Sequence, residues 1–155
     1  MHPTALSISE TALLACCGSR QWAERMAQLQ PFAAAEQMLD AADRVWWELS
    51  PTDWLEAFSA HPRIGEKGDA VASAEQSGVR GAAQEIMVRL ADDNRAYEQR
   101  FGYIYIVCAS GKTATEMLKT LEARLRNDRE TELRVAAEQQ RQITRLRLEK
   151  WLMER

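Results

Sequence analysis

The sequence predicts an all-α protein: a single compact multi-helix domain over residues 1–155, with an extended apolar segment near residues 103–109. Three observations support this class. Capping residues stand repeatedly where helices would begin, and apolar residues recur behind them at helical spacing. Only residues 103–109 (YIYIVCA) have the β-branched, apolar composition of a strand, and no second strand is available to pair with them. The length of 155 residues suits one domain around one hydrophobic core.

Capping signals predict where the helices begin. Ser7 and Glu10 form a capping-box pattern for a first helix, which Gly18 would end. Ser19 is placed to cap the next helix, and Pro31 stands where a third could begin. Further helices are expected after Ser50-Pro51, over residues 79–100, from Thr113 or Thr115 to Leu125, and from Asp128 or Thr131 to about Met153.

Composition excludes several classes of function. Twenty basic and 23 acidic residues give a net charge of −3, which provides no general attraction to nucleic acid or to a membrane surface. No run of 18 apolar residues exists, so no transmembrane helix is expected. Two histidines and three scattered cysteines do not make a metal site. The odd cysteine count, with no secretory pattern at the start and no peroxisomal pattern at the end, predicts a cytoplasmic protein.

One motif suggests phosphate binding and fails on spacing. The residues around Gly111-Lys112-Thr113 resemble the end of a phosphate-binding loop, which needs another glycine five positions before its last glycine. That position holds Ile106, so the backbone cannot form the phosphate cradle. We therefore interpret Gly111 as a turn residue and Thr113 as a helix cap.

The last expected helix carries an arginine that does not fit a simple solvated face. Arg147 lies four residues from both Ile143 and Trp151, so the three share one stripe of the helix. If that stripe faces the core, the guanidinium needs an anion. Leu146 and Leu148 offer competing apolar stripes, and the periodicity leaves the two alternatives open. Arg145 and Glu149, in contrast, have the spacing of an ordinary surface ion pair.

His61 is the most informative candidate for chemistry. It precedes Pro62, which disfavours helical geometry at residue 61, so the helix before it should end there. A ring near that helix end would be favoured in its protonated form by the partial negative charge of the helix terminus. A histidine that titrates near neutral pH can exchange a proton during a reaction. The alternative is a purely structural histidine.

An acid and an amide follow at the opening of the next helix. Gln76 completes a capping box with Ser73, and Glu75 is an acid in a first helical turn, so both have ordinary structural explanations. The same helix terminus presents unpaired N–H groups that suit a small anionic ligand. His61, Glu75 and Gln76 could therefore converge on one pocket.

At these residues the sequence resembles a known family. The matching pieces are GSRQWAERM with the following Pro-Phe, DWLEAFSAHPRIGEKG, SAEQSGV, YEQRFGYIYIVCASGKTATEMLKTLEARL and ITRLRLEKWL. Together they are similar to the 2-oxo-4-hydroxy-4-carboxy-5-ureidoimidazoline (OHCU) decarboxylases of the urate-to-allantoin pathway. The combination of AHPRIG, a downstream Glu-Gln and the Phe-Gly segment is specific, and the resemblance covers nearly the whole chain.

The resemblance implies an all-helical enzyme that needs no metal or organic cofactor. It assigns catalysis to His61 and Glu75. It assigns contacts with an anionic ureidoimidazoline substrate to further residues, which are Pro62, Ser73, Gln76, Tyr103, Ile104, Tyr105, Ile106, Val107 and Arg147. The family usually has a serine where this chain has Ala72, and Ser73 is one position late. The reaction implied is decarboxylation to (S)-allantoin. A homodimer is compatible with the resemblance, but the sequence leaves the oligomeric state open.

A second hypothesis is a helical interaction module without catalysis. The arginine-rich final helix and the five tryptophans would then serve an interface. This hypothesis predicts that His61, Glu75 and Arg147 do not meet in one closed pocket. The roles of Cys16, Cys17 and Cys108 stay open under both hypotheses.

Overall fold

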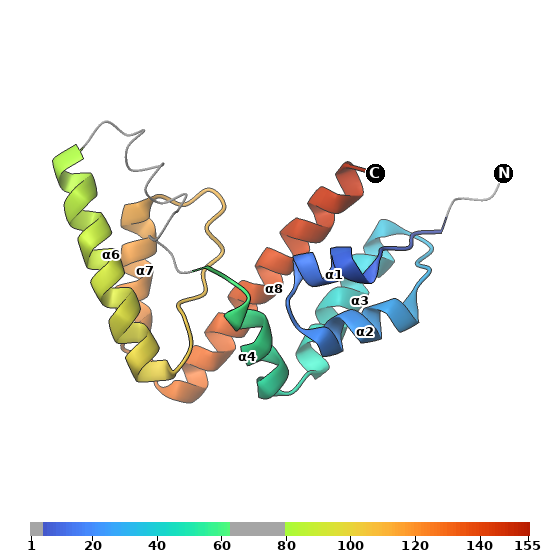
Figure 1. Ribbon diagram of the computed structural model, residues 1–155, viewed down its shortest axis with the longest axis horizontal. Helices are drawn as coiled ribbons and strands as arrows, with labels where there is room; N and C mark the ends of the chain where they lie inside the picture. The colour runs from blue at the N-terminus through green and yellow to red at the C-terminus, as the bar shows by residue number, and fades with distance from the viewer. Residues whose placement is uncertain (1–4, 63–79) are drawn as a thin grey trace. The chain divides into compact units, whose positions relative to one another are not determined.

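The computed structural model describes residues 5–62 and 80–155 (Figure 1). These residues contain seven helices and no strand, with one isolated backbone bridge between Leu6 and Phe32. The all-α class is therefore confirmed. The helices are α1 (Glu10–Cys16), α2 (Arg20–Leu29), α3 (Ala35–Glu48), α4 (Pro51–Ser59), α6 (Arg80–Phe101), α7 (Ala114–Arg124) and α8 (Arg129–Met153). None of the helices in these two ranges combines the length and apolar character that a membrane span requires.

The chain divides into two compact units. The first unit comprises Met1–Ala60 with Ala137–Arg155, and the second comprises His61–Ala136. Helix α8 contributes its first residues to the second unit and the rest to the first. Each unit has its own buried residues. That the chain forms one domain stays a prediction.

Three tryptophans hold the helices of the first unit together through their indole N–H groups. Trp22 of α2 donates to the carbonyl of Ala42 (3.1 Å), Trp46 of α3 donates to that of Ala137 (3.0 Å), and Trp54 donates to that of Trp46 (2.9 Å). All three side chains are buried. Each ring thus fills the core and satisfies its own polar group on a neighbouring helix. These three tryptophans are core residues, and only Trp47 is exposed.

Several predicted caps are confirmed. The Ser19 hydroxyl accepts from the Trp22 N–H (3.2 Å), and Ser50 precedes Pro51 and accepts from the Asp53 N–H (3.4 Å). Thr113 and Glu116 form a reciprocal capping box, and Asp128 caps α8 through the Thr131 N–H (2.7 Å). Gly111 lies in a turn with φ 74°, so the turn-and-cap interpretation of the Gly-Lys-Thr sequence is also confirmed.

Two predicted helix starts are wrong. The cap of α1 is Ser9, which accepts from the Ala12 N–H (3.1 Å), and not Ser7. Helix α3 begins at Ala35 and not at Pro31, because Phe32 is held in backbone pairing with Leu6. Phe32 and Leu6 exchange two N–H···O bonds of 2.8 and 2.7 Å, and a residue held in that way cannot join a helix.

Helix α1 ends at Cys16, with Cys17 as its C-cap, directly before Gly18 as predicted, but Gly18 does not have the positive φ of a glycine cap. A glycine is needed at position 18 for a different reason, which is close approach to α4. A Cβ atom built on Gly18 would lie only 2.5 Å from the Cβ of Ala60, the residue that ends α4. The α1–α2 connection therefore packs directly against the residue before His61.

We expect the Gly18→Ala substitution to lower the free energy of unfolding by about 1–3 kcal/mol, because the new methyl group overlaps that of Ala60. The double substitution Gly18→Ala with Ala60→Gly removes the overlapping atom and should recover most of the loss. Urea unfolding of the wild type and both variants measures this. A Gly18→Ala protein as stable as the wild type would show that the close contact is not a constraint.

The second unit is built around α6 and α7, which lie side by side (Figure 1). Helix α6 ends as predicted at Phe101, where Gly102 adopts φ 86° and its N–H returns to the Glu98 carbonyl (2.8 Å). Residues 104–109 then run without helix or strand, in agreement with the predicted extended apolar segment near residues 103–109. The buried cluster of this unit comprises Leu90, Tyr97, Phe101, Tyr105, Val107, Ala114, Met117, Leu118 and Leu121.

The three cysteines are free thiols and all are buried. Burial raises the pKa of the Cys17 thiol to about 11, although hydrogen bonds from the Ser19 backbone and the Thr144 side chain act in the opposite direction. Burial also raises the pKa of Cys16, and the nearby charge of Arg147 opposes this increase. Both thiols are therefore neutral core groups at physiological pH.

The raised pKa of Cys17 predicts a loss of stability in alkali. In the unfolded chain this thiol ionises near pH 9, whereas in the folded protein it resists ionisation up to about pH 11. The stability is therefore complete below about pH 9 and falls as the pH rises to 11, by on the order of 3 kcal/mol from this group. Urea unfolding from pH 8 to 11 should show a shallower decline for Cys17→Ala than for the wild type. Parallel declines would contradict the assignment.

Candidate functional site

His61 directly follows the end of α4, as its position before Pro62 predicts. The helix ends at Ser59, and the Ala60 N–H returns to the Ala57 carbonyl (3.2 Å). His61 is half-buried and Pro62 is exposed. Because Ala60 also packs against Gly18, the chain that leads into His61 is anchored on two sides.

Several predicted site residues lie outside the described residues. They are Ser73, Glu75, Gln76 and Ala72, together with the glycine-containing loop over residues 63–72. The second capping box and the meeting of Glu75 with His61 therefore stay predictions. Within the described ranges, no group of three or more His, Cys, Asp and Glu side chains could hold a metal ion.

The predicted substrate segment, residues 103–107, packs with a two-residue alternation. The side chains of Tyr105 and Val107 belong to the buried cluster of the second unit, and Tyr103 packs against its edge. Ile104 is only half-buried, and Ile106 is buried but lies outside this cluster. Such alternation is that of an extended chain, in which successive side chains point to opposite faces.

An ion pair that the sequence analysis missed lies behind this segment. Arg124, at the end of α7, donates from Nε (2.8 Å) and from a terminal nitrogen (2.5 Å) to one carboxylate oxygen of Glu132 in α8. The Tyr97 hydroxyl donates to the same oxygen, and the Asn127 amide donates to the other (3.0 Å). The two charged side chains are 6% and 0% exposed. The carboxylate is thus fully surrounded by donors.

The same arginine holds the apolar segment. Its remaining terminal nitrogen donates to the Ile106 carbonyl (2.6 Å), and its guanidinium carbon lies 4.7 Å from the centre of the Tyr105 ring. The Tyr105 hydroxyl donates in turn to the Met117 carbonyl of α7 (3.1 Å). Because Arg124 occupies the Ile106 carbonyl oxygen, any substrate contact through that oxygen would share it with the guanidinium.

The titration behaviour of these groups follows from their burial. Burial raises the pKa of Tyr105 to about 12 and raises the pKa of Tyr97 further, despite the opposing positive charge of Arg124. Burial by itself would lower the pKa of Arg124, but the hydrogen bond to Glu132 and the surrounding groups raise it overall. The arginine is therefore charged and both phenols are neutral at any physiological pH.

A signal for Arg124 was present in the sequence. Met117, Leu121 and Arg124 share one face of α7, and the first two are buried. An arginine in an apolar stripe requires an anion, which is the argument applied above to Arg147. The anion is Glu132, which lies beyond the end of α7 in the next helix, so helical spacing alone could not identify it.

Arg147 does not face the core, as one of the two alternatives from the sequence requires. The residue is exposed, and the buried stripe of this part of α8 comprises Thr144 and Leu148. A terminal nitrogen of Arg147 contacts the carbonyls of Ala15 (3.4 Å) and Cys16 (3.3 Å) at the end of α1. A cation at a helix C-terminus is favoured by the helix dipole. Arg147 belongs to the first unit, whereas His61 and residues 103–107 belong to the second.

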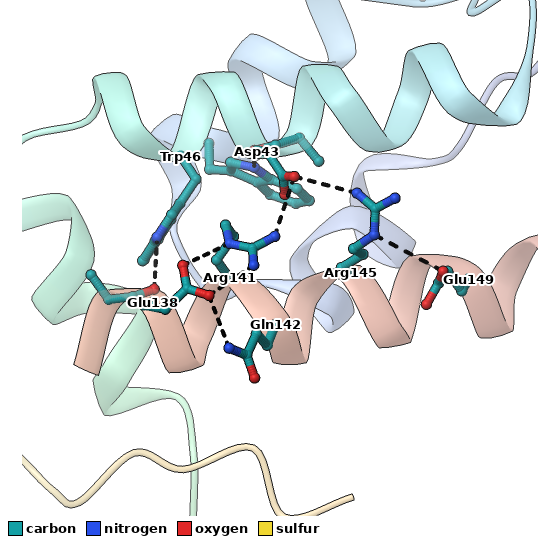
Figure 2. A network of polar contacts seen from close by, with 10 residues as sticks. Asp43, Trp46, Glu138, Arg141, Gln142, Arg145 and Glu149 are labelled. Atoms are coloured by element: carbon teal, nitrogen blue, oxygen red, sulfur yellow. Dashed lines mark hydrogen bonds and ion pairs between the residues drawn. The ribbon is translucent and has the colours of Figure 1, made fainter. Parts of the chain in front are cut away.

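The other arginines of this part of α8 are engaged by acids of their own unit. Figure 2 shows Asp43 of α3 reaching towards Arg141 and Arg145, with both distances 3.3 Å. Arg141 also makes two 2.8 Å hydrogen bonds with Glu138, and these raise its pKa. The predicted Arg145–Glu149 pair is confirmed at 4.0 Å. These contacts stabilise the unit and leave less charge for a binding surface.

We expect the Glu132→Leu substitution to destabilise the protein by about 3–5 kcal/mol, because it leaves the buried Arg124 charge without its partner. The matched control is Glu122→Leu, which breaks the exposed Arg89–Glu122 pair (2.6 Å) of the same unit. That change should cost less than about 1 kcal/mol. Urea unfolding compares the two, and equal losses would contradict the importance of burial.

Comparison with known proteins identifies the family of this chain. The sequence pattern described as OHCU decarboxylase matches residues 7–149. The uric acid degradation bifunctional protein TTL of Arabidopsis thaliana is 36% identical over 94% of this chain, which covers 48% of that relative. A 2-oxo-4-hydroxy-4-carboxy-5-ureidoimidazoline decarboxylase of Haloferax volcanii is 27% identical over 81% of the chain and 77% of its own length. The chain thus spans about half the length of the Arabidopsis relative.

A solved structure agrees with these matches. A crystal structure of OHCU decarboxylase in the presence of (S)-allantoin superposes with a TM-score of 0.81 and 37% identity, and covers 93% of this chain and 98% of the other. The helical fold of the described residues agrees with the fold of that solved structure. The chain belongs to the OHCU decarboxylase family.

Proposed function

We propose that this protein decarboxylates 2-oxo-4-hydroxy-4-carboxy-5-ureidoimidazoline to (S)-allantoin. The observation that carries the proposal is the family match over residues 7–149, which includes the His61-Pro62 motif and the 103–107 segment. The similarity to a structure described as OHCU decarboxylase in the presence of (S)-allantoin supports it, because that match covers 93% of this chain and 98% of the other.

The proposed reaction can proceed without a cofactor. The substrate carries a carboxylate on a ring carbon next to a C=N bond, which accepts the electron pair when carbon dioxide leaves. The enzyme must orient the carboxylate perpendicular to the ring, stabilise the enamine-like state that remains when carbon dioxide leaves, and protonate that state on one face. Fixed hydrogen-bond donors and one proton donor suffice for both tasks, so the proposal includes no metal and no organic cofactor.

The proposed roles follow the family resemblance. His61 delivers the proton, and Glu75 holds His61 and the substrate in place. Gln76, Ser73 and the backbone of residues 103–107 bind the ureido group and ring amides, with Pro62 against the ring. Arg147 neutralises the substrate carboxylate or an acidic neighbour. To bind the substrate carboxylate, its guanidinium must exchange its carbonyl contacts at the end of α1 for the anion.

The remaining parts of the proposal concern the setting. The partner is a small anionic ureidoimidazoline, without nucleic acid or membrane, and a homodimer is the oligomer that we propose to test. The three free, buried thiols support a reducing compartment and therefore the cytoplasm.

Freshly prepared substrate, made from urate by the upstream enzymes, tests the proposal. The protein should accelerate its decay and give a circular dichroism signal of (S)-allantoin, whereas spontaneous decay gives the racemate. We expect His61→Ala to lower turnover by at least ~10²-fold, the usual contribution of a general acid. Because the His61 side chain is only half-buried, the Tm of the His61→Ala protein should stay near that of the wild type.

Two results would contradict the assignment. Racemic product at the spontaneous rate from the wild type would reject the enzymatic function. A turnover rate of His61→Ala close to that of the wild type would instead remove His61 from the mechanism and leave the proposed function unchanged. The His61→Ala protein must be shown to be folded, by circular dichroism of its helices, before its turnover is compared.

A further inference from the structure

We propose that Arg124, held by Glu132, is a positioning residue for the decarboxylation, because it fixes the backbone of residues 103–107. The inference rests on the proposed function, in which this segment binds substrate. The helical pattern of α7 indicates that Arg124 needs an anion, but it does not mark Arg124 or Glu132 as part of the site. Neither side chain is needed to touch the substrate.

The first step of the argument is that the guanidinium is fixed in space. One oxygen of Glu132 accepts from two nitrogens of Arg124 and from the Tyr97 hydroxyl, and the other accepts from Asn127. The Arg124 guanidinium also lies over the Tyr105 ring. A planar group held at two nitrogens and on one face has no freedom to rotate.

The second step is that the fixed group fixes the segment. The third nitrogen of Arg124 donates to the Ile106 carbonyl at 2.6 Å. Residues 104–109 form neither helix nor strand, so no regular ladder sets the position of their backbone polar groups. Arg124 therefore gives the Ile106 carbonyl the hydrogen bond that a neighbouring strand would give it in a sheet.

The third step is the direction in which the segment then faces. The side chains of Tyr105 and Val107 are locked in the buried cluster, and the alternation is that of an extended chain. In an extended chain the backbone polar groups of successive residues point to opposite edges. With Ile106 turned towards Arg124, those of Tyr105 and Val107 are turned to the other edge, which is the edge that we propose faces the substrate.

The fourth step is that stability alone does not explain the pair. Buried ion pairs stabilise a fold little compared with apolar residues of the same volume, because both charges must be removed from water. The buried pair joins α7 to α8, and the exposed Arg89–Glu122 pair of the same unit joins α6 to α7. The buried pair differs from it in one respect that matters for a site, which is its bond to the Ile106 carbonyl.

The test separates folding from positioning. Arg124→Met with Glu132→Leu replaces both charges by apolar groups, so its Tm should stay within about 5 °C of the wild type. Arg124→Lys keeps the charge but offers one nitrogen in place of three. Both variants should lose about 10–100-fold in kcat, which is the scale of a misplaced substrate contact. Arg89→Gln with Glu122→Gln is the control and should keep wild-type kcat and KM.

The enantiomeric excess of the allantoin provides the readout that a structural role would not move. It is extrapolated to high enzyme concentration, where spontaneous decay no longer contributes. A smaller folded fraction lowers the rate but leaves the excess of (S)-allantoin unchanged. A displaced segment lets the substrate present either face, so the excess should fall for both variants and not for the control.

Each outcome decides the proposal. Folded variants with wild-type kcat and enantiomeric excess would overturn it, as would a lower rate with an unchanged excess. Failure of both variants to fold would also overturn it, since the pair would then serve the fold itself. In all three cases the wild type still makes (S)-allantoin and the proposed function survives. Racemic product from the wild type is the distinct result that rejects the proposed function.

Discussion

The buried charge of Glu132 is the constraint around which polar groups of the second unit are arranged. It is fully buried, and such a charge is tolerated only when hydrogen-bond donors surround it. Those donors come from α6, from the end of α7 and from the turn before α8, so a single oxygen pair joins three helices. Through Arg124 the same carboxylate also reaches the irregular segment after α6. At this point of the fold a hydrogen bond from a buried ion pair holds the backbone, where no helix or strand does so.

The first unit is held together differently. Three of its tryptophans bury their rings and donate to main-chain carbonyls of neighbouring helices, and its ion pairs lie near the surface. Exposed pairs of this kind contribute little individually, so packing carries most of the stability. The tight contact between Gly18 and Ala60 is also a packing contact, because it sets how closely the α1–α2 connection can approach the end of α4. That contact also fixes the end of the helix that leads to His61.

Much of the fold could be predicted because its signals are local. Ser19, Ser50 and Thr113 cap helices through atoms three residues away, which spacing reveals directly. The start of α3 could not be predicted, since it depends on pairing between Phe32 and Leu6. The same limit applied to the site. His61 could be singled out from its proline neighbour, whereas Arg124 needed knowledge of a partner in another helix.

The distribution of aromatic residues gives the two units separate optical signatures. All five tryptophans lie in the first unit, and all three tyrosines, Tyr97, Tyr103 and Tyr105, lie in the second. Excitation at the red edge of the indole band therefore observes one unit alone, while phenol absorption near 280 nm retains a contribution from the other. Near-ultraviolet spectra can thus follow the melting of each half of this chain without any added label.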